Sequence, residues 1–193
     1  MKKLKNILIL IPMISISCSS PYLTSYEPIN DFLELEKKNG NVHYILKAKE
    51  NNNQVLRIFN RGEESEHIVY SNEIDHTSKL FNEKQWKKLY KKYSQDTIKK
   101  YWKAEDFPGY ELIEGSRSLL FSSKFSNQYP NVENVIILSE PLYYNNRKYI
   151  MFFYHIDNNN FVGDTQMAVV MRKENKKWIV VEKIGDYNCS GCL

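Results

Sequence analysis

The sequence is poor in the residue types that usually mark a catalytic or metal-binding protein. It has only three cysteines and seven glycines among 193 residues, and the glycines are not clustered. A phosphate-cradling glycine loop is therefore excluded, and no serine stands in the Gly-x-Ser-x-Gly context of hydrolases. The four histidines show no paired spacing. Because a zinc centre needs about four ligands, we expect no metal and no other cofactor.

The chain also lacks a marked excess of charge of one sign. Its formal charge is +4, but three of its 27 basic residues are Lys2, Lys3 and Lys5 at the N-terminus. Without them, 24 basic residues face 23 acidic ones, so composition gives no argument for nucleic acid as a partner. Hydrophobic residues make up 42% and aromatic residues 13%, which is enough to bury a core and excludes a disordered tail.

No apolar run is long enough to cross a membrane. Residues 7–16 supply about half of the roughly 20 apolar residues that a spanning helix needs. The run follows the three N-terminal lysines, and Ser17 then precedes Cys18. This order predicts a secretory signal, residues 1–17, whose cleavage leaves Cys18 at the new N-terminus. An ordinary cleaved signal and an uncleaved anchor are the alternatives.

The same residues resemble the signal of bacterial lipoproteins, in which a small residue precedes a cysteine that is acylated on its sulfur and on its amine. The resemblance implies that Cys18 carries palmitate-like chains and that membrane lipid is a partner. Each buried methylene contributes about 0.8 kcal/mol, so several chains hold a protein durably. The location would be the bacterial cell envelope, at the outer membrane in a Gram-negative cell. Residues 18–28 would form the lipidated tether and residues 29–193 a single domain.

The two remaining cysteines, Cys189 and Cys192, form the sequence Cys-Ser-Gly-Cys just before Leu193. In an exported protein a local disulfide is the default state of such a pair. Free or intermolecular thiols, a metal site and redox catalysis are the alternatives. A redox motif needs a helix that lowers the pKa of the first thiol, and we expect no helix there.

The N-terminal half mixes helical and β-rich patterns. Residues 29–35 predict a short amphipathic helix that is capped near Asn30 or Asp31. The runs 42–49 and 54–60 are rich in β-formers and are separated by Glu50 and three asparagines, which predicts a hairpin. A third strand is expected over residues 67–71.

The clearest helical pattern covers residues 82–103. Its apolar positions have helical spacing and are expected to be buried against the sheet: Trp86, Leu89, Tyr90 and Tyr93. The opposite face carries five lysines: Lys84, Lys87, Lys88, Lys91 and Lys92. We interpret them as a solvated face, with attraction to anionic lipid head groups as the alternative. After a break at residues 94–96, residues 97–102 fit a second helix or a strand, and residues 116–129 predict another helix.

The C-terminal part predicts short strands at regular spacing, and therefore an antiparallel meander. The four runs are 134–140, 148–156, 165–173 and 177–185. Residues 149–154 are apolar at every position, which is typical of a central strand covered on both faces. The sequence thus predicts an α+β fold in which two or three helices cover an antiparallel meander. Cystatin-like and nuclear-transport-factor-like cones are two forms of this class.

Four consecutive motifs in this part are Leu138-Ser139-Glu140-Pro141, residues 148–154, Gly163 and residues 170–178. They resemble a group of uncharacterised lipoproteins from flavobacteria and their relatives. In those chains a Ser-x-Pro strand, a Tyr-rich strand, a Gly-containing loop and a Lys-Lys-x-Asn-x-x-Trp hairpin follow one another. The resemblance covers about the last third of the chain and implies a fold rather than a chemistry.

Candidates for chemistry are few. Glu73, Asp75 and His76 are the one tight group of acidic residues and a histidine, and they could serve a small envelope hydrolase. A solvated loop is the simpler interpretation of that group. The other histidines fall in predicted strands and are interpreted as packed or surface residues: His43, His67 and His155.

An aromatic surface that stacks on sugars is a further possibility. Its members would be Tyr143, Tyr144, Tyr149, Tyr154 and Phe161. The leading hypothesis is a non-catalytic binding or accessory protein of the envelope, with an unknown envelope protein or a glycan as its partner. The hydrolase and the glycan-binding module are the alternatives.

Overall fold

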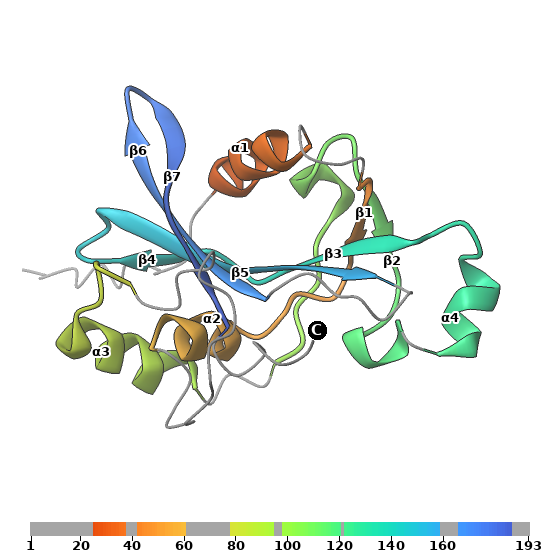
Figure 1. Cartoon of the computed structure of the whole chain (residues 1–193), viewed down its shortest axis with the longest axis horizontal. Helices are drawn as coiled ribbons and strands as arrows, with labels where there is room; N and C mark the ends of the chain where they lie inside the picture. The colour runs from red at the N-terminus through yellow and green to blue at the C-terminus, as the bar shows by residue number, and fades with distance from the viewer. Residues whose placement is uncertain are drawn as a thin grey trace, which may run out of the picture.

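The computed structural model describes residues 25–37, 42–60, 78–94, 98–120, 122–158 and 166–186. The described residues form an α+β fold with a mixed, mostly antiparallel seven-stranded sheet and four α-helices, which confirms the predicted class. Helix α1 (Glu27–Glu36) covers one face of the sheet. Helices α2 (Asn52–Phe59) and α3 (Glu83–Tyr93) lie on the other face, and α4 (Ser123–Gln128) lies at one end (Figure 1).

The sheet is built around the predicted meander. Its strands are β1 (Tyr44–Leu46), β2 (Glu111–Ile113), β3 (Asn134–Leu138), β4 (Leu142–Tyr144), β5 (Tyr149–Asn158), β6 (Met167–Glu174) and β7 (Lys177–Gly185). Their order is β2-β1-β3-β5-β6-β7, and β4 pairs with β5 on the same edge as β3. Strands β3, β5, β6 and β7 pair antiparallel, as predicted. The sequence analysis missed β4 and the parallel pairing of β1 with β2 and β3.

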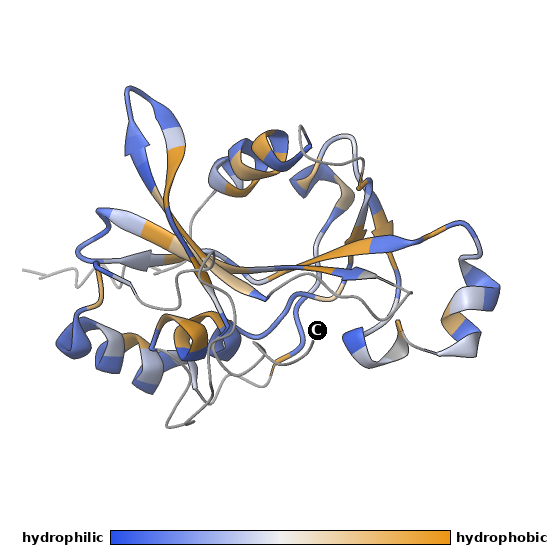
Figure 2. Cartoon of the chain, in the orientation of Figure 1, coloured by the Kyte–Doolittle hydropathy of each residue, from blue (hydrophilic) through white to orange (hydrophobic). Residues whose placement is uncertain are grey.

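Strand β5 is the centre of the molecule, because residues 149–154 are buried on both faces of the sheet. Met151 and Phe153 join the core between the sheet and α2. Ile150 and Phe152 point the other way, into a second core with α1. The hydrophobic residues along the middle strands are visible in Figure 2. The prediction of a central strand covered on both faces is therefore confirmed.

The predicted hairpin is wrong, because its second half is helix α2. Val55, Leu56 and Phe59 lie on one helical face and are buried, and the Asn51 side chain caps the helix by accepting a hydrogen bond from the Asn53 N–H. The β-branched residues of this run suggested a strand, but tertiary packing of the helical face outweighs that weak preference. The first half contributes only β1. The third strand expected at residues 67–71 lies outside the described residues.

Helix α1 starts earlier than predicted. It begins at Glu27 rather than at Asn30 or Asp31, so the last residues of the expected tether belong to the folded domain. Pro28 lies in the first helical turn, where its missing N–H would have had no partner in the helix anyway. Pro28, which was expected to lie in the tether, therefore stands in the first turn of a helix.

The lysine-rich helix is shorter than predicted, since α3 ends at Tyr93. Residues 98–102 form no helix, and Tyr101 forms an isolated antiparallel bridge with Ala48. Trp86 and Tyr93 are buried, whereas Leu89 and Tyr90 are half-buried at the edge of the core. Helix α3 contacts α2, with the Trp86 indole donating to the Leu56 carbonyl at 2.8 Å. The helix expected at 116–129 is split into a 3-10 turn (Arg117–Leu119) and α4.

Candidate ligand-binding cleft

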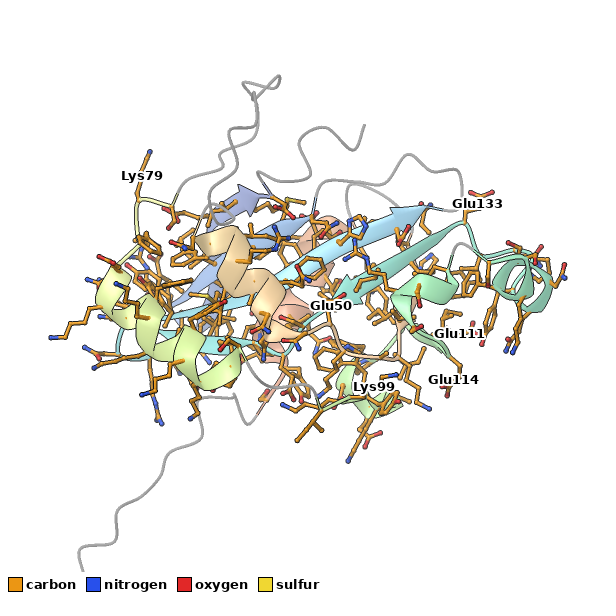
Figure 3. All side chains as sticks on the ribbon, turned by 90° about the horizontal axis from the view of Figure 1, so that it is seen from below. Glu50, Lys79, Lys99, Glu111, Glu114 and Glu133 are labelled. Carbon is orange, nitrogen blue, oxygen red and sulfur yellow. The ribbon has the colours of Figure 1, made fainter. Side chains whose placement is uncertain are left out.

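A cleft of about 150 Å³ opens where the chain leaves β1 and enters α2. Three segments that are distant in the sequence form its walls. They contribute Lys49, Glu50, Asn51, Asn52, Ile98, Lys99, Lys100 and Glu140. Figure 3 shows Glu50 at the beginning of α2 and Lys99 beside it at the edge of the molecule.

Backbone pairing beyond the ends of the strands holds these walls together. The Lys49 N–H donates to the Lys100 carbonyl at 2.9 Å, and the Glu50 N–H donates to the Leu138 carbonyl at 2.8 Å. Glu50 also forms a parallel bridge with Ser139. Since β1 and β3 are parallel, the residues that follow them come out at the same edge of the sheet. This register places Glu50 beside Glu140.

Lys49 and Glu140 form a buried ion pair at one side of the cleft. Their Nζ and Oε1 atoms are 2.8 Å apart, and their side chains are only 8% and 14% exposed. The Lys49 ammonium also lies 4.1 Å from the centre of the Trp102 ring, within cation–π range. A buried charge is tolerated when such partners replace its water. This wall is therefore a fixed, preorganised surface.

Tyr26 joins this ion pair from the turn before α1. Its hydroxyl accepts from Lys49 Nζ at 3.0 Å and donates to Glu140 Oε1 at 3.3 Å. Burial raises the pKa of Tyr26, and the hydrogen bond from Lys49 only partly offsets this rise. The hydroxyl therefore stays protonated at neutral pH. The first described residues of the chain are thus built into the wall of the cleft.

The start of α2 contributes a buried amide. Asn52 is only 6% exposed, and its Oδ1 accepts no hydrogen bond from the described part of the chain. An unsatisfied buried acceptor costs about 1 to 3 kcal/mol, so it favours a donor from water or from a ligand. The Glu50 carboxylate already has a partner, because its Oε1 accepts a hydrogen bond from the Asn51 N–H at 2.9 Å.

The cleft offers groups of both charges. Lys99 and Lys100 stand on one side of the cleft, and the Lys100 Nζ lies 3.5 Å from the Glu140 Oε2. Arg117 lies 3.8 Å from Glu50. Ammonium donors, carboxylate acceptors and an amide together suit a small polar molecule, or a polar group of a larger one, that carries both donors and acceptors.

Most residues singled out from the sequence lie elsewhere. The hydrolase candidates Glu73, Asp75 and His76 lie outside the described residues, as do His67, Phe161 and the three cysteines Cys18, Cys189 and Cys192. The described residues contain no cluster of three metal-ligating side chains. None of their helices combines the length and the apolar character that a bilayer crossing requires.

The remaining histidines, His43 and His155, do not form a common site. His43 is exposed just before β1, while His155 is buried on β5, with its Nε2 4.0 Å from Asp157 Oδ2. The aromatic surface is wrong for three of its members, because Tyr149 and Tyr154 are buried on the two covered faces of β5, and Tyr144 on β4 is buried against Phe59 of α2. A strip of these residues therefore cannot face a sugar.

The cleft was not predicted, because its residues fell in three separate predicted elements: the end and turn of a hairpin, the run 97–102 and the end of the run 134–140. Two signals were available. Glu50 directly follows the run predicted over residues 42–49, and Glu140 is the last residue of the run predicted over 134–140, just before Pro141. What the sequence did not reveal was the parallel pairing that brings them together.

The chain was compared with protein families, curated proteins and solved structures. No family model, curated protein or solved structure matches the chain.

Proposed function

We propose that the protein is a lipid-anchored lipoprotein of the bacterial envelope and acts as a non-catalytic binding or accessory module. Residues 1–17 are its export signal, and acylated Cys18 is its membrane anchor. The cleft at the start of α2 is its ligand site. Its partner is a polar envelope component, either a glycan or a protein that presents a polar group.

The observation that carries the proposal is that the cleft lies beside Tyr26, near the N-terminal end of the described residues. Tyr26 hydrogen-bonds to Lys49 and Glu140 in the wall of the cleft. It follows Cys18 by eight positions, which span at most about 28 Å when fully extended. A lipid on Cys18 would hold the cleft close to the membrane surface, where envelope components are concentrated.

The anchor is tested by replacing Cys18. We expect wild-type protein to sediment with membranes and to incorporate a labelled fatty acid, whereas Cys18→Ala should do neither because the acyl attachment point is gone. Cys189→Ala is the matched control and should keep both the label and the membrane location. Wild-type protein without label, or a labelled Cys18→Ala variant, would contradict the proposal.

A further inference from the structure

We infer that residues 98–103 form a membrane-contacting surface, on which Ile98 and Tyr101 enter the head-group boundary of the bilayer that holds the Cys18 anchor. The inference rests on the proposed function, since it uses the acylated cysteine. It also predicts a contact that lipidation alone does not require.

The first argument is the exposure of apolar side chains. Ile98 is 75% exposed and Tyr101 is 54% exposed, the two largest values for large hydrophobic side chains in the described part of the chain. They stand three positions apart, and backbone pairing with residues 47–49 begins between them, at Lys100. Interfacial anchors commonly pair an aliphatic side chain with an aromatic one that has a polar tip.

The second argument is that the segment is rigid. The Trp102 N–H donates to the Lys47 carbonyl at 2.9 Å, and the Lys100 carbonyl accepts from Lys49. The Trp102 side chain is 1% exposed and fixes the inward face of the segment. Tyr101 directly precedes Trp102 in the bridged part of the segment, so their side chains lie on opposite faces and Tyr101 is held outward. Its exposure is therefore imposed by the fold.

The third argument is the charge around these two residues. Lys99 is exposed and forms no ion pair with any described residue, and Lys103 is paired only with exposed Glu105 at 3.8 Å. Lys100 is shared with Glu140. The nearby acids Glu105 and Asp106 leave a small positive excess. A few lysines attract an anionic surface only weakly, so charge assists the apolar contact but does not dominate it.

The position of the lipid anchor favours the bilayer as the partner that covers residues 98–103. The Tyr26 ring packs edge-on against Trp102, with ring centres 5.0 Å apart. The anchored end of the domain therefore leaves the fold beside residues 98–103. A tether this short raises the effective concentration of the surface at the membrane, so a contact that is weak in free solution becomes occupied.

The lysine face of α3 does not share these features. Lys84, Lys88 and Lys91 are exposed, but the apolar side of the helix faces α2 and the core. A lysine face without exposed apolar side chains has no group that can insert into the bilayer. We therefore expect α3 to remain in solvent.

The test uses acylated full-length protein in vesicles of phosphatidylethanolamine and phosphatidylglycerol with brominated acyl chains. Tryptophan is introduced at Ile98 (Ile98→Trp) or, as the matched control, at exposed Lys79 (Lys79→Trp), which lies on the opposite side of the molecule from Lys99 (Figure 3). Emission of the wild-type protein, with its three tryptophans, is subtracted. We expect a blue shift and loss of emission by bromine quenching for Ile98→Trp only.

The outcomes separate the two proposals. The mass of the acyl group on Cys18 is read from the same sample, and its absence would overturn the anchor together with this inference. Acylated protein in which Ile98→Trp is quenched no more than Lys79→Trp would overturn the inference alone. The inference would also be overturned if the tryptophan at position 98 were protected from quenching by aqueous iodide but not quenched by bromine. That result would indicate that something other than lipid covers this residue. Thermal melting confirms that both variants are folded.

Discussion

At the scale of single residues, two long side chains place a polar group in the interior against specific partners. Lys49 has a carboxylate, a phenol and an indole ring around its ammonium group. The indole N–H of Trp86 is likewise buried and donates to the Leu56 carbonyl. In both cases one long side chain joins two segments that are distant in the sequence. Such contacts fix how the segments pack, beyond what apolar burial alone can do.

Replacement of Trp86 tests this at α3. We expect Trp86→Phe to lower the free energy of unfolding by about 1 to 3 kcal/mol, because it removes a buried donor and leaves a small cavity. The free energy is measured by urea denaturation. The control is Lys84→Gln on the exposed face of α3, which should change stability by only tenths of a kcal/mol. Equal, small effects for both variants would show that the hydrogen bond adds nothing.

How far the sequence predicts such residues depends on how local their environment is. Trp86 and Tyr93 could be assigned to the core because helical spacing is a local signal. The pairing of Lys49 with Glu140 could not, because it depends on the parallel register of β1 and β3. A residue whose partner is set by long-range topology carries no sign of that partner in its own neighbourhood.

At the scale of elements, the meander was predictable and the N-terminal half was not. Strands β5, β6 and β7 are joined by short connections, and their alternation and turn residues lie within each local window. Asn175 and Lys176 both adopt left-handed backbone conformations in the β6–β7 turn, with φ of 48° and 69°. By contrast, α2 contains enough β-branched residues to suggest a strand. Only its position against the sheet explains why it is helical.

Helix α1 and the β6–β7 hairpin are linked at Glu27. Its Oε2 accepts from Lys173 Nζ at 3.0 Å and from the Trp178 indole at 3.3 Å. The hydrogen bond from Lys173 lowers the pKa of Glu27, and the Trp178 bond assists. Because the pKa is lowered in the fold, the stabilisation is present above the ordinary glutamate pKa and is lost as pH falls through the lowered value. It is small, since both charged side chains are about half exposed (46% and 47%).

An NMR titration of the Glu27 side-chain carboxyl carbon checks this link. We expect a pKa below the ordinary glutamate value in the wild-type protein and a return toward that value in Lys173→Gln. Glu83 serves as an internal control, because its pKa is lowered by Lys87 and should not respond to the change at position 173. An unchanged Glu27 titration in Lys173→Gln would mean that the helix and the hairpin are not coupled through this pair.

At the scale of the whole molecule, the two hydrophobic cores share one sheet, and a buried ion pair ties its last strand to α2. Arg57 binds both carboxylate oxygens of Asp186, which directly follows β7 and is fully buried. Gln54 accepts from the same guanidinium at 3.2 Å and 3.1 Å. This network holds the end of the described C-terminal part against the helix that borders the cleft.

A double-mutant cycle measures that link. Asp186→Ala should lower the free energy of unfolding by about 2 to 4 kcal/mol, because Arg57 is left without its carboxylate although it keeps some contact with water. The double variant with Arg57→Met should be less destabilised than the sum of the single changes. Glu114→Ala, which breaks an exposed pair with Lys47, is the control and should cost about 1 kcal/mol or less. Additive effects in the Arg57 and Asp186 cycle would contradict the coupling.

The parallel pairing of β1 also bears on the order in which the protein folds. Tyr44 pairs with Glu111 and Ile45 with Ile136, so this strand finds its neighbours only after most of the chain is available. The hairpins of the meander close locally, and contacts between distant segments form slowly because their loop entropy must be overcome first. During synthesis, the earliest strand to emerge therefore waits unpaired while the last ones assemble. Until the meander is complete, β1 has no neighbouring strand to pair with, and the walls of the cleft cannot assemble.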